Sequence, residues 1–218
     1  MKTLSLVRLA GIAACTAVLA SCSGPSQPAN TGVYMLIDTS GTYREEIQKA
    51  EQIIRYTLSQ LDATDSFAVA RIDTGSFSEK DIVAKITFDD RPTTMNQQKR
   101  AFAEQVRTFV DEAGSSPYTD ITGGLLQAIE YLNEKGPGAK TILIFSDLKE
   151  ELEDGYIRDI DFELAGFEII ALNVTKLRSD NIDPREYMTR LDEWQAKVET
   201  SGGSWRVIND LDGLDGLL

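Results

Sequence analysis

Histidine is absent from this chain of 218 residues. Catalytic triads of the Ser-His-Asp and Cys-His kinds need an imidazole to accept a proton, so the chain cannot form them. Zinc and copper sites that depend on histidine nitrogen are excluded for the same reason. Any chemistry of the chain therefore rests on carboxylates, hydroxyls, amines and the backbone.

Cysteine is scarce, because Cys15 and Cys22 are the only two in the sequence. Cys15 lies in an N-terminal segment that we expect to be removed. The remaining chain then has no thiol pair for a disulfide, even in an oxidising compartment. It must be held together by its apolar core, and roughly 190 residues are enough for one domain with a sizeable core.

Basic residues are few, since 22 Lys and Arg stand against 35 Asp and Glu, for a formal net charge of −13. Removal of residues 1–21 would take away Lys2 and Arg8, leaving 20 basic side chains and a net charge of −15. Such a surface repels the phosphates of nucleic acid and of anionic lipid. We expect neither as a partner, whereas divalent cations and basic proteins are compatible with this charge.

The first 22 residues have the layout of a cleaved export signal. Lys2 and Arg8 form a short basic region, and an apolar stretch from Leu9 to Ala20 follows it. This stretch is shorter than the roughly 20 apolar residues that a membrane-spanning helix needs. Its end, Leu19-Ala20-Ser21-Cys22, resembles the lipobox of bacterial lipoproteins. The resemblance implies cleavage before Cys22 and a diacylglycerol on its sulfur; an ordinary secretory signal with a chance cysteine is the alternative.

A lipid on Cys22 implies a location in the bacterial cell envelope, with contact to the membrane through the lipid anchor alone. Ser23, directly after the lipidated position, implies the outer membrane in a Gram-negative cell. We expect a signal peptide at residues 1–21, a lipidated cysteine and polar tether at 22–31, and one domain at 32–218. Nine extended tether residues reach about 30 Å, so the domain is expected close to its membrane.

Segments typical of strands and helices alternate from Gly32 onward. Val33–Ile37 and Thr141–Phe145 are continuous apolar runs, as expected for strands that are buried on both faces. Further strands are predicted at Ser66–Ile72, Ile82–Phe88, Phe167–Val174 and Ser204–Ile208, and helices at Tyr43–Leu61, Thr94–Ala113, Gly123–Asn133 and Pro184–Thr200. The pattern predicts an α/β fold with a doubly wound, mainly parallel central sheet and one antiparallel edge strand.

Three polar clusters occur where the chain leaves this predicted sheet or enters a helix. Asp38-Thr39-Ser40-Gly41-Thr42 follows the first strand, Ser146-Asp147 follows Thr141–Phe145, and Thr119-Asp120 precedes a helix. Ligands of doubly wound sheets bind at the carboxyl ends of the strands. Carboxylate and hydroxyl oxygens suit Mg²⁺, which takes six oxygen ligands and usually keeps several waters.

The region from about residue 32 to residue 218 resembles the von Willebrand factor type A domain. That family has a metal-ion-dependent adhesion site whose first loop reads Asp-x-Ser-x-Ser, and this chain has Asp38-Thr39-Ser40-Gly41-Thr42. A second loop supplies a threonine, matched by Thr119 in TDITGGLLQAI, and a third supplies an aspartate, matched by Asp147 in ILIFSD. The resemblance implies Mg²⁺ or Mn²⁺ held by Asp38, Ser40, Thr42, Thr119 and Asp147.

The resemblance also implies a function, which is binding rather than catalysis. An acidic side chain of a partner protein would take the open position on the metal. The chain departs from the family pattern in three places: Thr42 replaces a serine, Leu148 stands where glycine usually follows the third-loop aspartate, and no glycine pair precedes Thr119. These departures bear on metal affinity and loop shape.

Two alternatives use the same residues. The apolar strand followed by Asp38-Thr39-Ser40-Gly41-Thr42 also resembles the nucleophile loop of haloacid-dehalogenase-like phosphotransferases, with Ser146 in the second motif, and an aspartate beside Mg²⁺ could transfer phosphoryl groups. Against this, Ser40 stands where hydrolytic members have a second aspartate, the acidic pair Asp89-Asp90 precedes ILIFS, and Thr119 has no role. The other alternative is a type A scaffold with a vestigial site, in which these polar residues cap helices or are solvated.

Overall fold

The structure, a computed structural model, describes residues 29–41, 43, 46–73, 78–158, 160–210, 214 and 216–218. The expected signal peptide, the lipidation site Cys22, most of the tether and Thr42 lie outside the described residues. In chain order the elements are β1 (Thr31–Asp38), α1 (Ile47–Gln60), β2 (Ser66–Ile72), η2 (Glu79–Asp81), β3 (Ile82–Thr87), α2 (Pro92–Glu112), α3 (Ile121–Lys135), β4 (Ala139–Phe145), β5 (Phe167–Leu172), η3 (Ser179–Asn181), α4 (Pro184–Thr200) and β6 (Ser204–Ile208), where η marks a 3₁₀-helix.

The strands form one six-stranded sheet in the order β3-β2-β1-β4-β5-β6. Every neighbouring pair is parallel except β2 and β3, which are antiparallel. The predicted doubly wound sheet with one antiparallel edge strand is therefore confirmed. The two continuous apolar runs lie side by side at its centre, with Val33 opposite Thr141 and Ile37 opposite Phe145. The strand order reverses between β1 and β4, the position where such sheets bind ligands.

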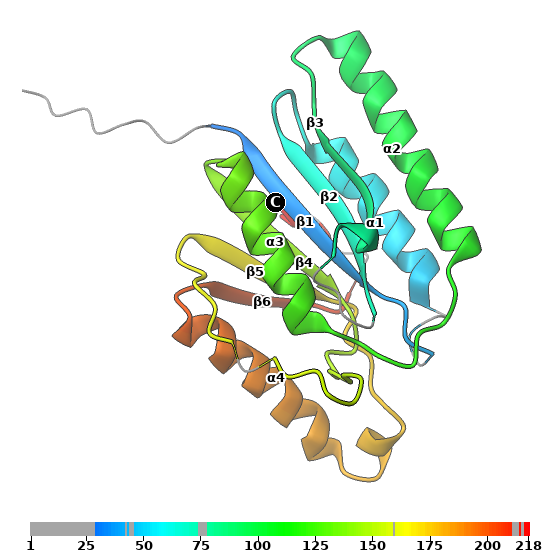
Figure 1. The fold of residues 1–218 in the computed structure, drawn as a ribbon, viewed down its shortest axis with the longest axis vertical. Helices are drawn as coiled ribbons and strands as arrows, with labels where there is room; N and C mark the ends of the chain where they lie inside the picture. Colours follow the sequence, from blue (N-terminus) through cyan, green and yellow to red (C-terminus); the bar gives the residue numbers. More distant parts are fainter. Residues whose placement is uncertain are drawn as a thin grey trace, which may run out of the picture.

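Helices cover both faces of the sheet, α1 and α2 on one face and α3 and α4 on the other (Figure 1). Successive side chains of a strand point to opposite faces, so β1 contributes to both cores. Val33, Met35 and Ile37 pack with α1 and α2, whereas Tyr34 and Leu36 pack with α3 and α4. Each large apolar side chain that is fully buried in this way contributes about 1.5–3 kcal/mol.

Several element ends differ from the sequence prediction, and three of these differences have a clear physical reason. The first helix begins at Ile47 rather than Tyr43, because Tyr43 is buried in the preceding loop with its hydroxyl on the carbonyl of Asn173 at 2.5 Å. Helix α3 begins earlier than predicted, at Ile121, because the Asp120 carboxylate accepts a hydrogen bond from Gly123 N and caps the helix. Strand β5 ends at Leu172, since Asn173 adopts a left-handed φ of 51°.

The point where the chain enters the sheet and the polar loops lie at opposite edges of the parallel strands. The chain enters β1 at Thr31, on the amino edge, and the polar loops lie on the opposite, carboxyl edge (Figure 1). Eight residues of β1 at about 3.3 Å each separate these edges by about 26 Å. None of the helices in the described ranges has the length and apolar character required to span a bilayer.

Candidate metal centre

Asp38 lies at the carboxyl end of β1, is 0% exposed and links three segments of the chain. Its Oδ1 accepts a hydrogen bond from Ser40 N at 2.8 Å, and its Oδ2 accepts one from Ser146 Oγ at 2.7 Å. Thr119 Oγ1 lies 3.4 Å from Oδ1 of the same carboxylate. The Asp38 side chain is therefore the point where the first, second and third loops meet.

Asp147 follows β4 and is buried, with 2% of its surface exposed. Since β1 and β4 are paired up to Ile37 and Phe145, the residues that follow both strands leave the sheet together. Asp147 Oδ1 accepts a hydrogen bond from Lys149 N at 2.9 Å. The Asp147 charge is near enough to Asp38 to raise the pKa of that carboxyl group.

Backbone hydrogen bonds connect the three loops to one another. Gly41 N donates to Ser116 O at 3.2 Å and Ser116 N donates to Thr39 O at 2.9 Å, which fixes the first loop to the segment before Thr119. Thr119 and Glu151 exchange two hydrogen bonds, N to O, at 2.7 and 2.9 Å. The second loop is thus fixed to the first on one side and to the segment after Asp147 on the other.

The electrostatics of this centre favour a bound cation. The pKa of Asp38 is raised to about 6. Burial is the largest cause, the hydrogen bonds from Ser146 and Ser40 act in the opposite direction, and the charge of Asp147 adds to the rise. Two neighbouring buried carboxylates repel each other when both are ionised. A divalent cation between them would offset both charges. In the absence of such an ion, Asp38 retains a proton to a higher pH than an exposed aspartate does.

The donor set fits a small, hard cation. The structure brings Asp38, Ser40, Thr119 and Asp147 together, and these offer two carboxylates and two hydroxyls. Within the described part of the chain, no group of three or more Asp, Glu, Cys or His residues is placed to hold a metal, so a cation here would depend on hydroxyl and water oxygens. Oxygen-rich shells completed by water are typical of Mg²⁺. The contribution of Thr42 remains a prediction, because Thr42 is outside the described residues.

Ser146 is a site residue that the type A resemblance did not include. Its hydroxyl donates to Asp38 Oδ2 and accepts from Leu148 N at 3.0 Å. The available signal was its position, directly before Asp147 at the end of a central strand. Of the functions considered from the sequence, the phosphotransferase alone gives Ser146 a role.

Leu148 explains how the third loop forms without the glycine that usually follows its aspartate. Leu148 adopts a left-handed φ of 64°, a conformation that costs a residue with a Cβ atom roughly 1–2 kcal/mol. Its side chain is 1% exposed and packs in the core between the sheet, α3 and α4. Burial of a leucine side chain contributes about as much as this strain costs, or more. The loop therefore keeps the left-handed turn although glycine is missing.

The acidic run Glu150-Glu151-Leu152-Glu153-Asp154, which follows Asp147, contacts the beginning of α3. Glu150 accepts hydrogen bonds from Thr122 N at 2.7 Å and Thr122 Oγ1 at 3.1 Å, at the first turn of α3. Further along the same loop, Arg158 binds the buried Asp120 carboxylate through Nε and Nη2, at 3.1 and 2.7 Å. These contacts hold the long segment between β4 and β5 against the beginning of α3.

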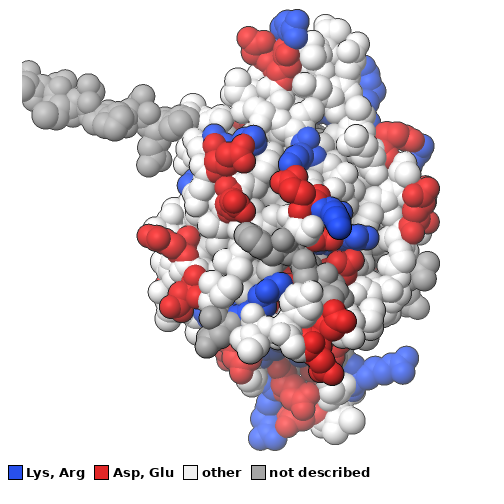
Figure 2. Space-filling model, in the orientation of Figure 1, with Lys and Arg blue, Asp and Glu red and all other residues white. Residues whose placement is uncertain are grey.

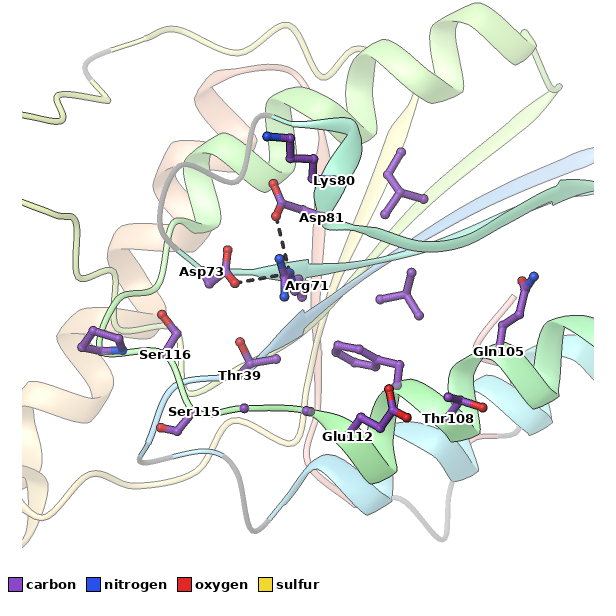
Figure 3. Close-up of a pocket in the computed structure, with 16 residues that line it drawn as sticks. Thr39, Arg71, Asp73, Lys80, Asp81, Gln105, Thr108, Glu112, Ser115 and Ser116 are labelled. Carbon is purple, nitrogen blue, oxygen red and sulfur yellow. Dashed lines mark ion pairs between the residues drawn. The ribbon is translucent and has the colours of Figure 1, made fainter.

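A pocket of about 810 Å³ adjoins the first and second loops (Figure 3). Arg71 lies between Asp73 and Asp81, at 3.3 and 3.5 Å, with Glu112 on another wall. Burial raises the pKa of both aspartates. Thr39 is the first-loop residue that lines this pocket, and the Asp38 carboxylate is directed into the three-loop junction instead.

The sequence and the fold were compared with those of known proteins. No protein-family model and no curated protein matches the sequence. Among solved structures, the von Willebrand factor type A protein from Catenulispora acidiphila superposes with a TM-score of 0.50 at 16% identity, over 84% of this chain and 39% of that one. The chain has the fold of a von Willebrand factor type A domain.

A second solved structure similar to this chain is the pilus adhesin SpaC from Lactobacillus rhamnosus GG in its open conformation. That match has a TM-score of 0.54 at 10% identity and covers 89% of this chain and 29% of the adhesin. The chain thus spans less than half of the length of either solved protein. At these identities the likeness establishes the fold alone. What the site can bind has to be inferred from the residues of this chain.

Proposed function

We propose that this type A domain is an extracytoplasmic binding module that engages a protein partner through Mg²⁺ or Mn²⁺. The ion is held by Asp38, Ser40, Thr42, Thr119 and Asp147. The observation that carries the proposal is the junction of three loops at the buried Asp38 carboxylate. When bound, the cation offers an open coordination position to a carboxylate oxygen of the partner.

Neutral donors around Asp38 support a cation at this place. The hydrogen bonds to its carboxylate come from a backbone N–H and from hydroxyl groups. A buried ionised carboxylate without a compensating positive charge is costly, and Asp147 adds a second negative charge. A divalent ion removes that cost, which gives the two aspartates a reason to be buried together.

Exposed apolar side chains on the segment that follows Asp147 favour a protein as the partner. Tyr156, Ile157 and Ile160 are 45%, 78% and 46% exposed, on the segment that Arg158 fixes to Asp120. Apolar side chains that are exposed together are typical of protein-binding surfaces. On the face shown in Figure 2, acidic and basic side chains are interspersed and form no continuous basic tract.

The location follows from the lipobox, with lipid on Cys22 and attachment to the bacterial envelope, at the outer membrane in a Gram-negative cell. Thr31 lies on the amino edge of the sheet, opposite the metal centre, so a lipid-anchored domain would present the centre away from its membrane. The N-terminal peptide of the mature protein should carry the mass of the lipid. An unmodified peptide, or an intact residue 1–21 segment, would contradict the anchor.

Binding rather than catalysis is the reading that the centre supports best. Hydrolytic phosphotransferases have a second aspartate where Ser40 stands, and here Ser40 N binds the Asp38 carboxylate instead. A phosphotransferase also needs no contribution from Thr119. The remaining alternative, a scaffold with a vestigial site, differs from our proposal in one property, the binding of metal.

A thermal titration tests the proposal. The melting temperature of the wild-type domain should rise with the concentration of Mg²⁺ or Mn²⁺, because the ion binds only the folded state. Asp38→Ala should fold and lose this response. An unchanged melting temperature at millimolar metal would favour the vestigial scaffold, and hydrolysis of an aryl phosphate that depends on Asp38 would favour the phosphotransferase.

A further inference from the structure

The peptide groups on both sides of Leu148 are held by side chains. The carbonyl of Asp147 accepts a hydrogen bond from Arg190 Nε at 2.8 Å. The N–H of Leu148 donates to Ser146 Oγ at 3.0 Å, and the carbonyl of Leu148 accepts from Trp194 Nε1 at 3.0 Å. Three successive backbone polar groups therefore have side-chain partners, and two of these partners belong to α4.

Arg190 has its own orientation fixed. Its Nη1 and Nη2 atoms bind the Asp180 carboxylate at 3.3 and 2.9 Å, and the Asp180 side chain is fully buried. Asp180 in turn accepts a hydrogen bond from Leu177 N at 2.7 Å. A guanidinium is planar with donors in a rigid fork, so holding one side of it directs Nε at the Asp147 carbonyl.

Arg190 and Trp194 are four residues apart on α4 and so lie on the same face of the helix. A pocket of about 720 Å³ lies between α4 and loop residues 148–150. Across this pocket, long side chains rather than close backbone packing connect the helix to the loop. The connection therefore depends on the donors at the ends of those side chains.

We propose that α4 positions Asp147 in the metal centre through Arg190 and Trp194, and thereby sets the affinity for the cation. The inference rests on the proposed function. A left-handed leucine is a strained state that persists only where its surroundings impose it. When the hydrogen bonds from α4 are removed, the peptide between Asp147 and Leu148 can rotate toward an unstrained conformation, and the Asp147 carboxylate turns away from Asp38.

The test measures the dissociation constant of Mn²⁺ alone, from the electron paramagnetic resonance signal of the free ion. Arg190→Lys keeps the charge but loses the fork, and Trp194→Phe keeps the ring but loses the donor. Substitution of groups that orient metal ligands typically weakens binding by about 10–100-fold, and we expect Arg190→Lys to fall in this range. Arg185→Lys is the matched control, because Arg185 is on the same helix with its side chain 88% exposed.

A second readout is independent of the metal. Amide hydrogen exchange at Leu148 and Lys149 in the metal-free protein should be faster in Arg190→Lys and Trp194→Phe than in the wild type or Arg185→Lys, whereas exchange in the central strands should be unchanged. Folded Arg190→Lys and Trp194→Phe variants with wild-type Mn²⁺ affinity and wild-type exchange would overturn the inference. Should the wild type bind no Mn²⁺, the proposed function fails, and the exchange data still decide whether α4 holds the loop.

Discussion

Ser146 Oγ donates a 2.7 Å hydrogen bond to Oδ2 of Asp38, across 108 positions of sequence. The two residues meet because β1 and β4 are neighbours whose last paired residues are Ile37 and Phe145. The bond fixes Oδ2 of the Asp38 carboxylate and leaves Oδ1 toward Ser40 and Thr119. It also places a negative charge in a buried position, where its partners in the described residues are neutral donors.

Asp38→Asn should make the metal-free domain more stable and insensitive to metal. The amide removes a buried charge and its repulsion from Asp147. The rise of the Asp38 pKa from 3.8 to about 6 means that ionised Asp38 destabilises the folded domain by at most about 3 kcal/mol at neutral pH. Urea unfolding measures the difference in the free energy of unfolding. Asp192→Asn, at an exposed position of α4, is the control and should change little. A metal-free Asp38→Asn domain less stable than the wild type would contradict the electrostatic argument.

The contribution of Asp38 to the stability of the metal-free domain should fall as the pH rises, because the pKa of its carboxyl group is raised. In the metal-free protein, the stabilising contribution of protonated Asp38 is fully present below about 3.8 and is lost as pH rises through about 6. The difference in unfolding free energy between wild type and Asp38→Asn isolates this contribution from Asp73 and Asp81, whose pKa values are also raised by burial. A difference that is flat between pH 4 and pH 7 would contradict it.

The metal affinity should depend on pH in the opposite direction. A cation must displace the Asp38 proton below about pH 6, so the affinity for Mn²⁺ should fall by about tenfold for each further unit of decrease. Calorimetric titrations with Mn²⁺ between pH 5 and pH 8 would measure this. An affinity that stays constant across the range would mean that the metal does not bind through this carboxylate.

At Leu148, glycine should be a better replacement than alanine, which is the reverse of the usual order. Both variants lose the buried side chain and its packing, at a cost of about 2–5 kcal/mol. Only alanine keeps the strain of a left-handed φ, so Leu148→Gly should be more stable than Leu148→Ala by about 1 kcal/mol. Chemical denaturation of the two variants decides the order. A more stable alanine variant would mean that the left-handed turn does not persist.

Arg158→Met should destabilise the domain by about 3 kcal/mol, because it removes the ion pair that Arg158 makes with the buried Asp120 carboxylate. The double variant Arg158→Met/Asp120→Asn should recover part of that loss, since an asparagine can still cap α3 through its carbonyl oxygen. Thermal unfolding of the single and double variants gives the coupling. If the double variant is less stable than Arg158→Met, the ion pair is not the reason for the loss.

Much of the site was predictable from the chain because its residues stand at the ends of recognisable strands. Val33–Ile37 and Thr141–Phe145 are apolar throughout, so their central position in the sheet follows from burial on both faces. Once these strands are adjacent, Asp38 and Asp147 must emerge at the same edge. The sequence pattern alone therefore sufficed for the position of these two aspartates.

The contacts that support the site were not predictable in the same way. Arg190 and Trp194 look like ordinary positions of an amphipathic helix, and their partners are backbone atoms of Asp147 and Leu148 that carry no sequence signal. The left-handed Leu148 contradicts local preference, because the gain from burying its side chain exceeds a strain of one residue. Tyr43 likewise leaves the predicted helix for a tertiary hydrogen bond to Asn173.

The central claim is that one cation joins the three loops at Asp38, and a crystal structure grown with Mn²⁺ tests it most directly. The account predicts an anomalous difference peak in contact with oxygens of Asp38, Ser40, Thr119 or Asp147, directly or through one water, at about 2.0–2.2 Å for direct ligands. The peak should be absent from crystals of Asp38→Asn. A wild-type map without a peak at this junction, or with the Mn²⁺ bound elsewhere, would contradict the account.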